Sequence, residues 1–256
     1  MIFRIFAHVL IKSRSMTVKT RAIVLHSVRY GDNQLIVDFF TEAMGRLSFI
    51  VRLAKSAKAK MKRQYFQPLS ILNIEFDHRP SLSLQRLKDI GISLPYADML
   101  VNPYKISMTL FLSEFLYYST RNEQNNIPLF QFLVNSMEWL DMAPANFSNF
   151  HLVLMMHLTL FLGFAPNMEI DAKGRYFDLM EGKFVPFVPT HSHYLSEEDS
   201  GKMRTLMRLR YQTMHLYTMS RHERNKCVEV ILSYYQLHLP AFPELKTLPI
   251  LKELFG

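Results

Sequence analysis

The residues with the clearest chemical potential are seven cations that cluster between positions 46 and 63. No Asp or Glu stands between Glu42 and Glu75, so the whole stretch carries charge of one sign. Guanidinium and ammonium groups spaced along one segment can neutralise successive phosphates of a nucleic acid. A charge run is often only a solvated surface, but this one holds most of the chain's positive excess. We therefore predict phosphate contacts by Arg46, Arg52, Lys55, Lys58, Lys60, Lys62 and Arg63.

Aromatic residues accompany this basic segment. Tyr65 and Phe66 follow it closely, Phe49 lies within it, and Tyr30 precedes it. Small β-barrels bind single strands by stacking bases on aromatic rings while cations follow the phosphates. For Phe49, a place in the core is the simpler interpretation.

A second, weaker basic cluster lies near the C-terminus and is diluted by Glu223 and Glu229. It would either widen a nucleic-acid track or cover a solvated helix face, and the sequence does not separate these alternatives. Its members are Arg208, Arg210, Arg221, Arg224 and Lys226.

Signatures of catalysis are absent from the sequence. It has no phosphate-binding Gly-rich loop, no dinucleotide fingerprint, no His-Glu-x-x-His and no Gly-x-Ser-x-Gly. Cys227, beside Val228, is interpreted as a buried structural thiol. His191 and His193 lack further ligands for a metal, and the acidic residues 197–199 suit the first turn of a helix. We expect no enzyme activity, no metal and no cofactor.

Composition places the cationic excess in one region. The chain has 256 residues and a formal charge of +8, of which residues 16–100 carry +6 and residues 101–256 carry −1. This asymmetry indicates a local anionic partner. A single cysteine excludes an internal disulfide and fits a reducing cytoplasm. The apolar run Leu152–Phe164 is shorter than the roughly 20 residues of a membrane span, so we expect no membrane association. We also expect Met16 to be the working start, which leaves residues 1–15 outside the domains.

The elements around the basic segment have the pattern of strands. Apolar, β-branched and aromatic runs cover residues 22–25, 35–40, 47–51, 70–76 and 82–87, and turn residues separate them. Residues 90–94 could extend the last strand. We predict a domain over residues 16–96 that forms an OB-like β-barrel, with an open sheet and an SH3-like barrel as alternatives.

From Pro103 the apolar period changes to three and four residues, which predicts an all-α domain over residues 97–256. Helices are expected at residues 103–118, 127–142, 147–164, 197–209, 221–239 and 244–255. Ser196 is predicted to cap the fourth of these helices. Prolines and glycines mark an irregular insertion at about 167–195 that contains a short hairpin. The fold class is therefore α+β with two domains.

Several segments of the chain resemble the RecO family of recombination mediators. The resemblance covers nearly all of residues 16–256, and no single motif carries it. The similar segments are Thr20–Leu25, Arg29–Asn33, Phe40–Ser48, Leu162–Pro166, Ile231–Leu239, Lys246–Leu248 and Leu251–Leu254.

Two departures from the family pattern change what the resemblance implies. Many members carry a four-cysteine zinc site in the insertion, but this insertion has no cysteine, so no zinc is carried over. Leu53 also stands where the family commonly has a glycine in its basic strand.

The resemblance implies a non-enzymatic role in recombinational repair. Such proteins bind single- and double-stranded DNA, anneal complementary strands and pair with RecR. They also contact the acidic C-terminal tail of single-stranded-DNA-binding protein (SSB), which helps RecA load on coated strands. Two other classes compete with this interpretation: an adaptor that binds only proteins, and a nuclease, for which no carboxylate constellation is evident.

Overall fold

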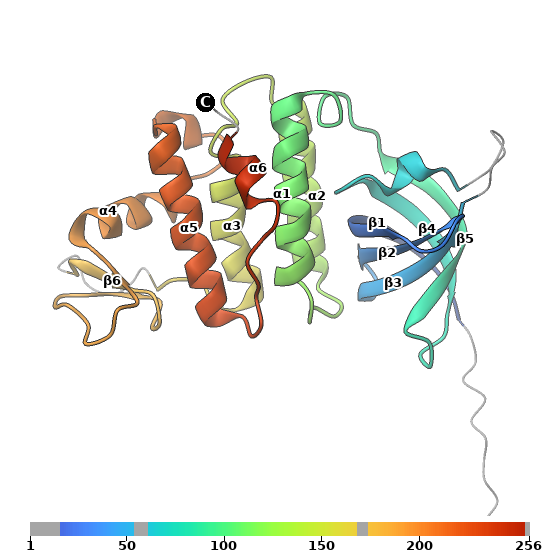
Figure 1. Ribbon diagram of the computed structural model, residues 1–256, viewed down its shortest axis with the longest axis horizontal. Coiled ribbons are helices and arrows are strands. Elements are labelled where there is room, and N and C mark those ends of the chain that lie inside the picture. The colour runs from blue at the N-terminus through green and yellow to red at the C-terminus, as the bar shows by residue number, and fades with distance from the viewer. Residues whose placement is uncertain (1–15, 54–60, 168–173, 254–256) are drawn as a thin grey trace, which may run out of the picture.

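A five-stranded barrel and a helical domain lie side by side in the computed structural model, which describes residues 16–53, 61–167 and 174–253 (Figure 1). The strands are β1 (Met16–Arg29), β2 (Gln34–Thr41), β3 (Gly45–Arg52), β4 (Ile71–His78) and β5 (Leu84–Leu94). They close into a barrel in the order β1-β2-β3-β5-β4, with β3 and β5 parallel and the other pairs antiparallel. The predicted OB-like fold is confirmed, and residues 90–94 do extend the last strand.

The barrel forms because its strands alternate between an apolar core side and an outer side. Val37 and Phe39 of β2, Phe49 and Val51 of β3, and Phe76 of β4 are all buried in the barrel core. The rings of Phe39, Phe49 and Phe76 meet edge to face. Phe49 is therefore a core residue, as its apolar surroundings in the sequence suggest.

The helical domain contains α1 (Pro103–Ser119), α2 (Ile127–Met142), α3 (Phe150–Leu162), α4 (Glu197–Leu206), α5 (Arg221–His238) and α6 (Leu248–Glu253). Single turns of 3-10 helix, η1 (Arg63–Phe66) and η2 (Met214–Leu216), complete the helical elements of the described chain. The α3 helix is buried along most of its length, which agrees with its nearly continuous apolar sequence. Among the residues that the structure describes, no helix is long and apolar enough to cross a bilayer.

Three helices are shorter than the sequence pattern predicts, and α4 is one of them, since it ends at Leu206. The third helix ends at Leu162 because Gly163 adopts the left-handed conformation of a C-cap. The last helix begins only at Leu248, because the carboxylate of Glu114 accepts hydrogen bonds from the backbone N–H groups of Lys246 and Thr247. This side chain on α1 holds the incoming segment in a non-helical conformation.

The insertion forms a small sheet of three strands in the order β7-β6-β8. The predicted hairpin is present as β6 (Tyr176–Asp178) and β7 (Lys183–Val185), and the additional strand β8 (Tyr194–Leu195) pairs with the other edge of β6. Ser196 caps α4 by accepting a hydrogen bond from the N–H of Asp199, as predicted. The sheet and α4 occupy the end of the molecule opposite the barrel (Figure 1).

The outer wall of the barrel shares an apolar core with the helices, separate from the core inside the barrel. Ile23, Leu25 and Phe40 point out of the barrel and belong to the same buried cluster as residues of α1 and α2. The Ser113 hydroxyl of α1 donates a hydrogen bond to the carbonyl of Leu25 at 2.6 Å. The junction is therefore packed like a domain interior.

The connector between the domains, residues 95–102, is held at the end of α2 by Asp141. Its carboxylate accepts hydrogen bonds from the N–H groups of Ala97, Asp98 and Met99 at 2.7–2.9 Å. Burial raises the pKa of Asp141, but these hydrogen bonds and the charge of Lys105 together lower it below its ordinary value. The ionised carboxylate is therefore the form that the folded connector requires.

We expect the stabilising effect of Asp141 to disappear in acid. A carboxyl group whose pKa is lowered by folding stabilises fully above its unfolded pKa of about 3.9 and loses this effect as pH falls through the lower folded value. The difference in unfolding free energy between the parent chain and Asp141→Asn should then shrink from pH 6 toward pH 3. Urea denaturation over this range measures it, with Asp32→Asn in an exposed loop as the control. A constant difference would contradict the assigned role.

Candidate nucleic-acid interface

Strand pairing places cationic and apolar side chains together on the outside of the barrel. Residues directly opposite each other in neighbouring strands point to the same side of the sheet. The pairs Gln34↔Arg52, Ile36↔Ile50 and Val28↔Ile36 join β1, β2 and β3, and the parallel pair Ile50↔Arg86 adds β5. We call this surface the β2–β3 face, and it comprises Val28, Gln34, Ile36, Ile50, Arg52 and Arg86.

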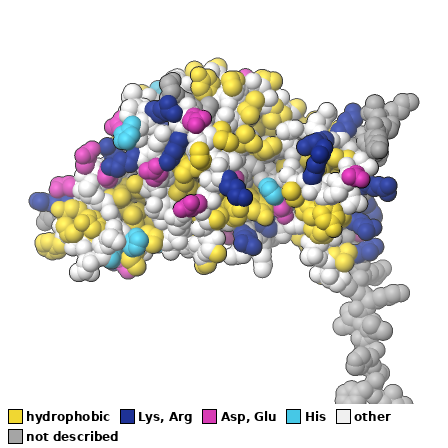
Figure 2. Space-filling model, viewed as in Figure 1, with side chains coloured by type: hydrophobic (Ala, Val, Ile, Leu, Met, Phe, Trp, Pro, Cys, Tyr) yellow, Lys and Arg dark blue, Asp and Glu magenta, His cyan; other side chains and the backbone are white. Residues whose placement is uncertain are grey.

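The exposed end of the β2–β3 face is positively charged. Arg52 and Arg86 are exposed, and neither forms an ion pair with any residue that the structure describes. The last residue of β1, Arg29, adds an exposed cation, and the turn that follows adds the ring of Tyr30, which is 55% exposed. Figure 2 shows Lys and Arg side chains at the barrel end of the molecule. The face thus combines cations, one aromatic ring and a strip of apolar side chains.

Within the predicted basic segment, Arg52, Lys62 and Arg63 are exposed on the barrel surface. Lys55, Lys58 and Lys60 lie outside the described residues. Of the aromatic residues that accompany the segment, Phe66 is buried in the barrel core and Tyr65 is half-buried against it. Tyr30 is therefore the best exposed aromatic ring among the four.

Arg46 occupies the junction with the helical domain. Its guanidinium donates a hydrogen bond to the carbonyl of Tyr117 at 2.8 Å and lies 4.7 Å from the centre of that ring. The ring of His26 also packs against Tyr117, and the centres of these two rings are 4.9 Å apart. Arg46 therefore holds α1 against β3, which is a different environment from that of the exposed Arg52.

A buried carboxylate supports this junction. Asp38 accepts a hydrogen bond from the hydroxyl of Ser48, and its Oδ2 atom lies 3.5 Å from Nδ1 of His26. Burial raises the pKa of Asp38, but the hydrogen bonds of His26 and Ser48 and the charge of Arg46 lower it by more, so the net pKa lies below its usual value. The negative charge of Asp38 thus balances Arg46 at the inner end of the β2–β3 face.

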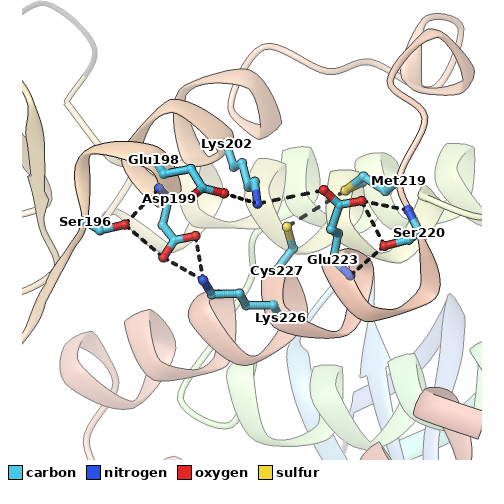
Figure 3. A network of polar contacts seen from close by, with 9 residues as sticks. All are labelled: Ser196, Glu198, Asp199, Lys202, Met219, Ser220, Glu223, Lys226 and Cys227. Carbon is cyan, nitrogen blue, oxygen red and sulfur yellow. Dashed lines mark hydrogen bonds and ion pairs between the residues drawn. The ribbon is translucent and has the colours of Figure 1, made fainter.

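The second basic cluster divides into engaged and exposed members. Lys226 binds both carboxylate oxygens of Asp199 at 2.8 Å, which joins α5 to α4 (Figure 3). Arg224 is buried and donates to Oδ1 of Asn149 and to the carbonyl of Met219. Arg221 donates to the carbonyl of Lys252 at 2.7 Å. We therefore remove Arg224 from the predicted surface track, and only Arg208 and Arg210 remain as exposed cations without such ties.

The polar contacts around Lys226 are structural in character. Ser220 and Glu223 form a reciprocal cap at the start of α5, and Lys202 links Glu198 to Glu223 (Figure 3). Cys227 lies beneath this network, and burial raises the pKa of its thiol to about 11. A protonated, buried thiol does not act as a nucleophile near neutral pH. The arrangement clamps α4 to α5.

No cluster of three or more potential metal-ligating side chains occurs in the described parts of the chain. His191 instead lies 3.2 Å from Oδ2 of Asp178, within the small sheet.

One residue of the β2–β3 face, Arg86, escapes prediction from the sequence. It lies far along the chain from the basic segment and reaches the face only because β5 pairs in parallel with β3. The sequence carries no clear signal for it, because Leu84–Leu87 does not alternate between apolar and polar residues and the buried residue there is the polar Gln85.

Comparison with known proteins agrees with this architecture. The family model described as Recombination protein O N terminal matches residues 16–96, and the one described as Recombination protein O C terminal matches residues 101–248. The DNA repair protein RecO of Phocaeicola vulgatus is 46% identical over 241 residues, which cover 94% of this chain and 100% of that protein. The RecO proteins of Bacteroides fragilis and Flavobacterium johnsoniae are 45% and 38% identical, again over 94% of this chain and 100% of theirs. The chain therefore belongs to the RecO family of DNA repair and recombination proteins.

Proposed function

We propose that the chain is a non-enzymatic recombination mediator that binds single- and double-stranded DNA through the β2–β3 face and the adjoining basic segment. The observation that carries this proposal is the strand register that brings Arg52, Arg86 and the apolar strip of Ile36 and Ile50 onto one exposed surface. OB-type barrels bind oligonucleotides on this face and on the loops that flank it. Tyr30 lies in one of these loops.

The face offers contacts to both parts of a nucleotide. Bases can stack on Tyr30 and pack on the apolar strip, while phosphates approach Arg29, Arg52 and Arg86. Lys62 and Arg63 extend the cationic surface beside the barrel, and contacts of this kind do not depend on base sequence. Arg46 packs at the domain junction, where the charge of Asp38 balances its own. We therefore do not expect Arg46 to be among the first residues that contact phosphate.

Annealing and RecA loading complete the proposed role. Cations that neutralise the backbones of two strands lower their mutual repulsion, which favours pairing of complementary sequences. Membership of the RecO family supports RecR and the acidic C-terminal tail of SSB as partners, which would help RecA load on coated single strands in the cytoplasm. These partners are proposed from the family alone.

Salt-dependent binding tests the DNA contacts. Fluorescence anisotropy of a labelled single strand, titrated at several salt concentrations, gives a slope of about −0.7 in log affinity per log salt for each phosphate neutralised. We expect Arg52→Gln and Arg86→Gln each to make the slope shallower by about 0.7, the contribution of one phosphate. The triple exchange of Lys58, Lys60 and Lys62 to glutamine should flatten the slope further. Affinity should fall equally for all base sequences.

Lys19→Gln is the matched control, because Lys19 is an exposed cation on β1 that pairs with Glu75 of β4. It should leave the slope unchanged. Undetectable binding by the parent chain, or equal slopes in all variants, would favour the adaptor that binds only proteins.

A further inference from the structure

A cavity of about 810 Å³ lies between α4 and the small sheet, at the end of the molecule away from the barrel. Its volume falls within the range of roughly 300–1,000 Å³ that is usual for ligand sites. Residues of β6, of the segment after β7 and of one side of α4 line it. They include Arg175, Phe187, Val188, Glu197, Gly201 and Arg204.

Two arginines give the cavity an anion-binding character. Arg204 is held in place, because its guanidinium donates to the carbonyl of Gly174 at 2.9 Å and lies 4.4 Å from the centre of the Phe184 ring. Arg175 is exposed. Neither arginine forms an ion pair with another residue in the described ranges. Among the described residues that line the cavity, Glu197 is the acidic one.

An exposed aromatic ring stands beside these cations. Phe187 is 81% exposed and its neighbour Val188 is 51% exposed. Figure 2 shows hydrophobic side chains on the surface at this end of the molecule. Gly201 keeps the α4 side open, since a Cβ atom there would meet nothing within 4 Å. Glycine inside a helix is unfavourable relative to alanine, and ligand access at this open position would explain its presence.

We propose that this cavity binds a nucleotide of a second DNA single strand, with the base on Phe187 and the phosphate between Arg175 and Arg204. A nucleotide matches both halves of the site, because its base has a flat face and its phosphate accepts the forked hydrogen bonds of guanidinium groups. The inference rests on the proposed function, since it gives the second strand of an annealing reaction its own place.

The position of the cavity gives it a kinetic role. A strand held there is tethered to the same molecule as the strand on the β2–β3 face, which raises the effective concentration of each for the other. Because the two sites lie at opposite ends of the molecule, they do not compete for the same phosphates. Long strands can pair in the stretch between them.

Annealing by the full chain tests the site. The rate at which two complementary oligonucleotides pair should fall about tenfold in Phe187→Ala, because loss of one base–aromatic stack has an effect of this order. Arg175→Gln should also slow annealing. Glu197→Gln should accelerate it, because the variant removes the negative charge at the cavity. Met180→Ala is the control, since Met180 is an exposed apolar residue of the same insertion outside the cavity.

Binding of the first strand separates this inference from the proposed function. Affinity for a short single strand at limiting concentration should be the same in all four variants, because the β2–β3 face is unchanged. Photocrosslinking of 5-iododeoxyuridine strands at saturation should label peptides around Phe187 as well as the barrel. Normal first-strand binding with equal annealing in Phe187→Ala and Met180→Ala, or crosslinks confined to the barrel, would overturn the second site. Failure of the parent chain to bind any strand would instead overturn the proposed function.

Discussion

Replacing Lys105 with methionine is expected to lower the free energy of unfolding by about 3 kcal/mol, because it removes the donor from two carbonyl groups and the partner from a partly exposed carboxylate. The Lys105 side chain is fully buried at the start of α1. Its ammonium group lies 2.8 Å from Oδ2 of Asp98 and donates to the carbonyls of Asp141 and Ala143 at 3.0 and 2.7 Å. The ring of Phe147 covers it at 5.1 Å.

Each N–H donor of Lys105 thus has an acceptor, and these acceptors come from the connector and from the end of α2. Methionine preserves the volume of the side chain but leaves two carbonyl groups without a donor, which adds the cost of buried polar groups. The variant should therefore loosen the connector and the end of α2 together. Urea denaturation followed by circular dichroism measures the change.

Lys88→Met provides the matched control. Lys88 also pairs with a carboxylate, that of Asp77 at 2.6 Å, but both groups are substantially exposed to solvent. Exposed pairs contribute roughly 0–1 kcal/mol, so this variant should remain close to the parent chain. Equal destabilisation by Lys105→Met and Lys88→Met would show that the burial of Lys105 does not account for its contribution to stability.

The second large effect is expected for Gly45→Ala, which should destabilise the fold by at least about 2 kcal/mol through backbone strain and steric overlap. Gly45 begins β3 with φ of +68°, and a Cβ atom there would lie 2.3 Å from the carbonyl oxygen of Gln124. That oxygen belongs to the loop between α1 and α2. The adjacent N–H of Arg46 also donates to the carbonyl of Glu123. Alanine would therefore push the barrel away from the helices.

Gly31→Ala separates strain from overlap. Gly31 has nearly the same φ of +67°, but a Cβ atom there would meet nothing within 4 Å. This variant should show only the cost of a left-handed alanine, about 1–2 kcal/mol. Thermal unfolding of both variants gives the comparison, and equal losses of stability would remove the contact with Gln124 from the explanation.

Local patterns in the sequence predict most of the elements. The apolar runs at residues 35–40 and 47–51 predict strands because one side of each lies in the barrel core, and at Phe40 the outer side also packs on the helices. The boundaries of α2 agree with the prediction because Asn126 caps its first turn and Pro144 follows its last residues. Such features are local and therefore readable in the order of residues.

The partners of individual charges are not readable in the same way. Arg46 and Arg52 stand in the same basic segment, yet one binds the carbonyl of Tyr117 and the other faces solvent. Arg224 and Arg208 differ likewise, since only Arg224 reaches Asn149. These differences depend on contacts between residues distant in the chain, which charge patterns do not encode.

The shared core has a consequence for dissecting the protein. A fragment that ends after residue 96 would leave Ile23, Leu25 and Phe40 without the helices that cover them. Exposed apolar patches of this kind promote aggregation. The helical domain therefore covers the outer wall of the barrel, and we expect the barrel alone to aggregate when it is separated from the helices.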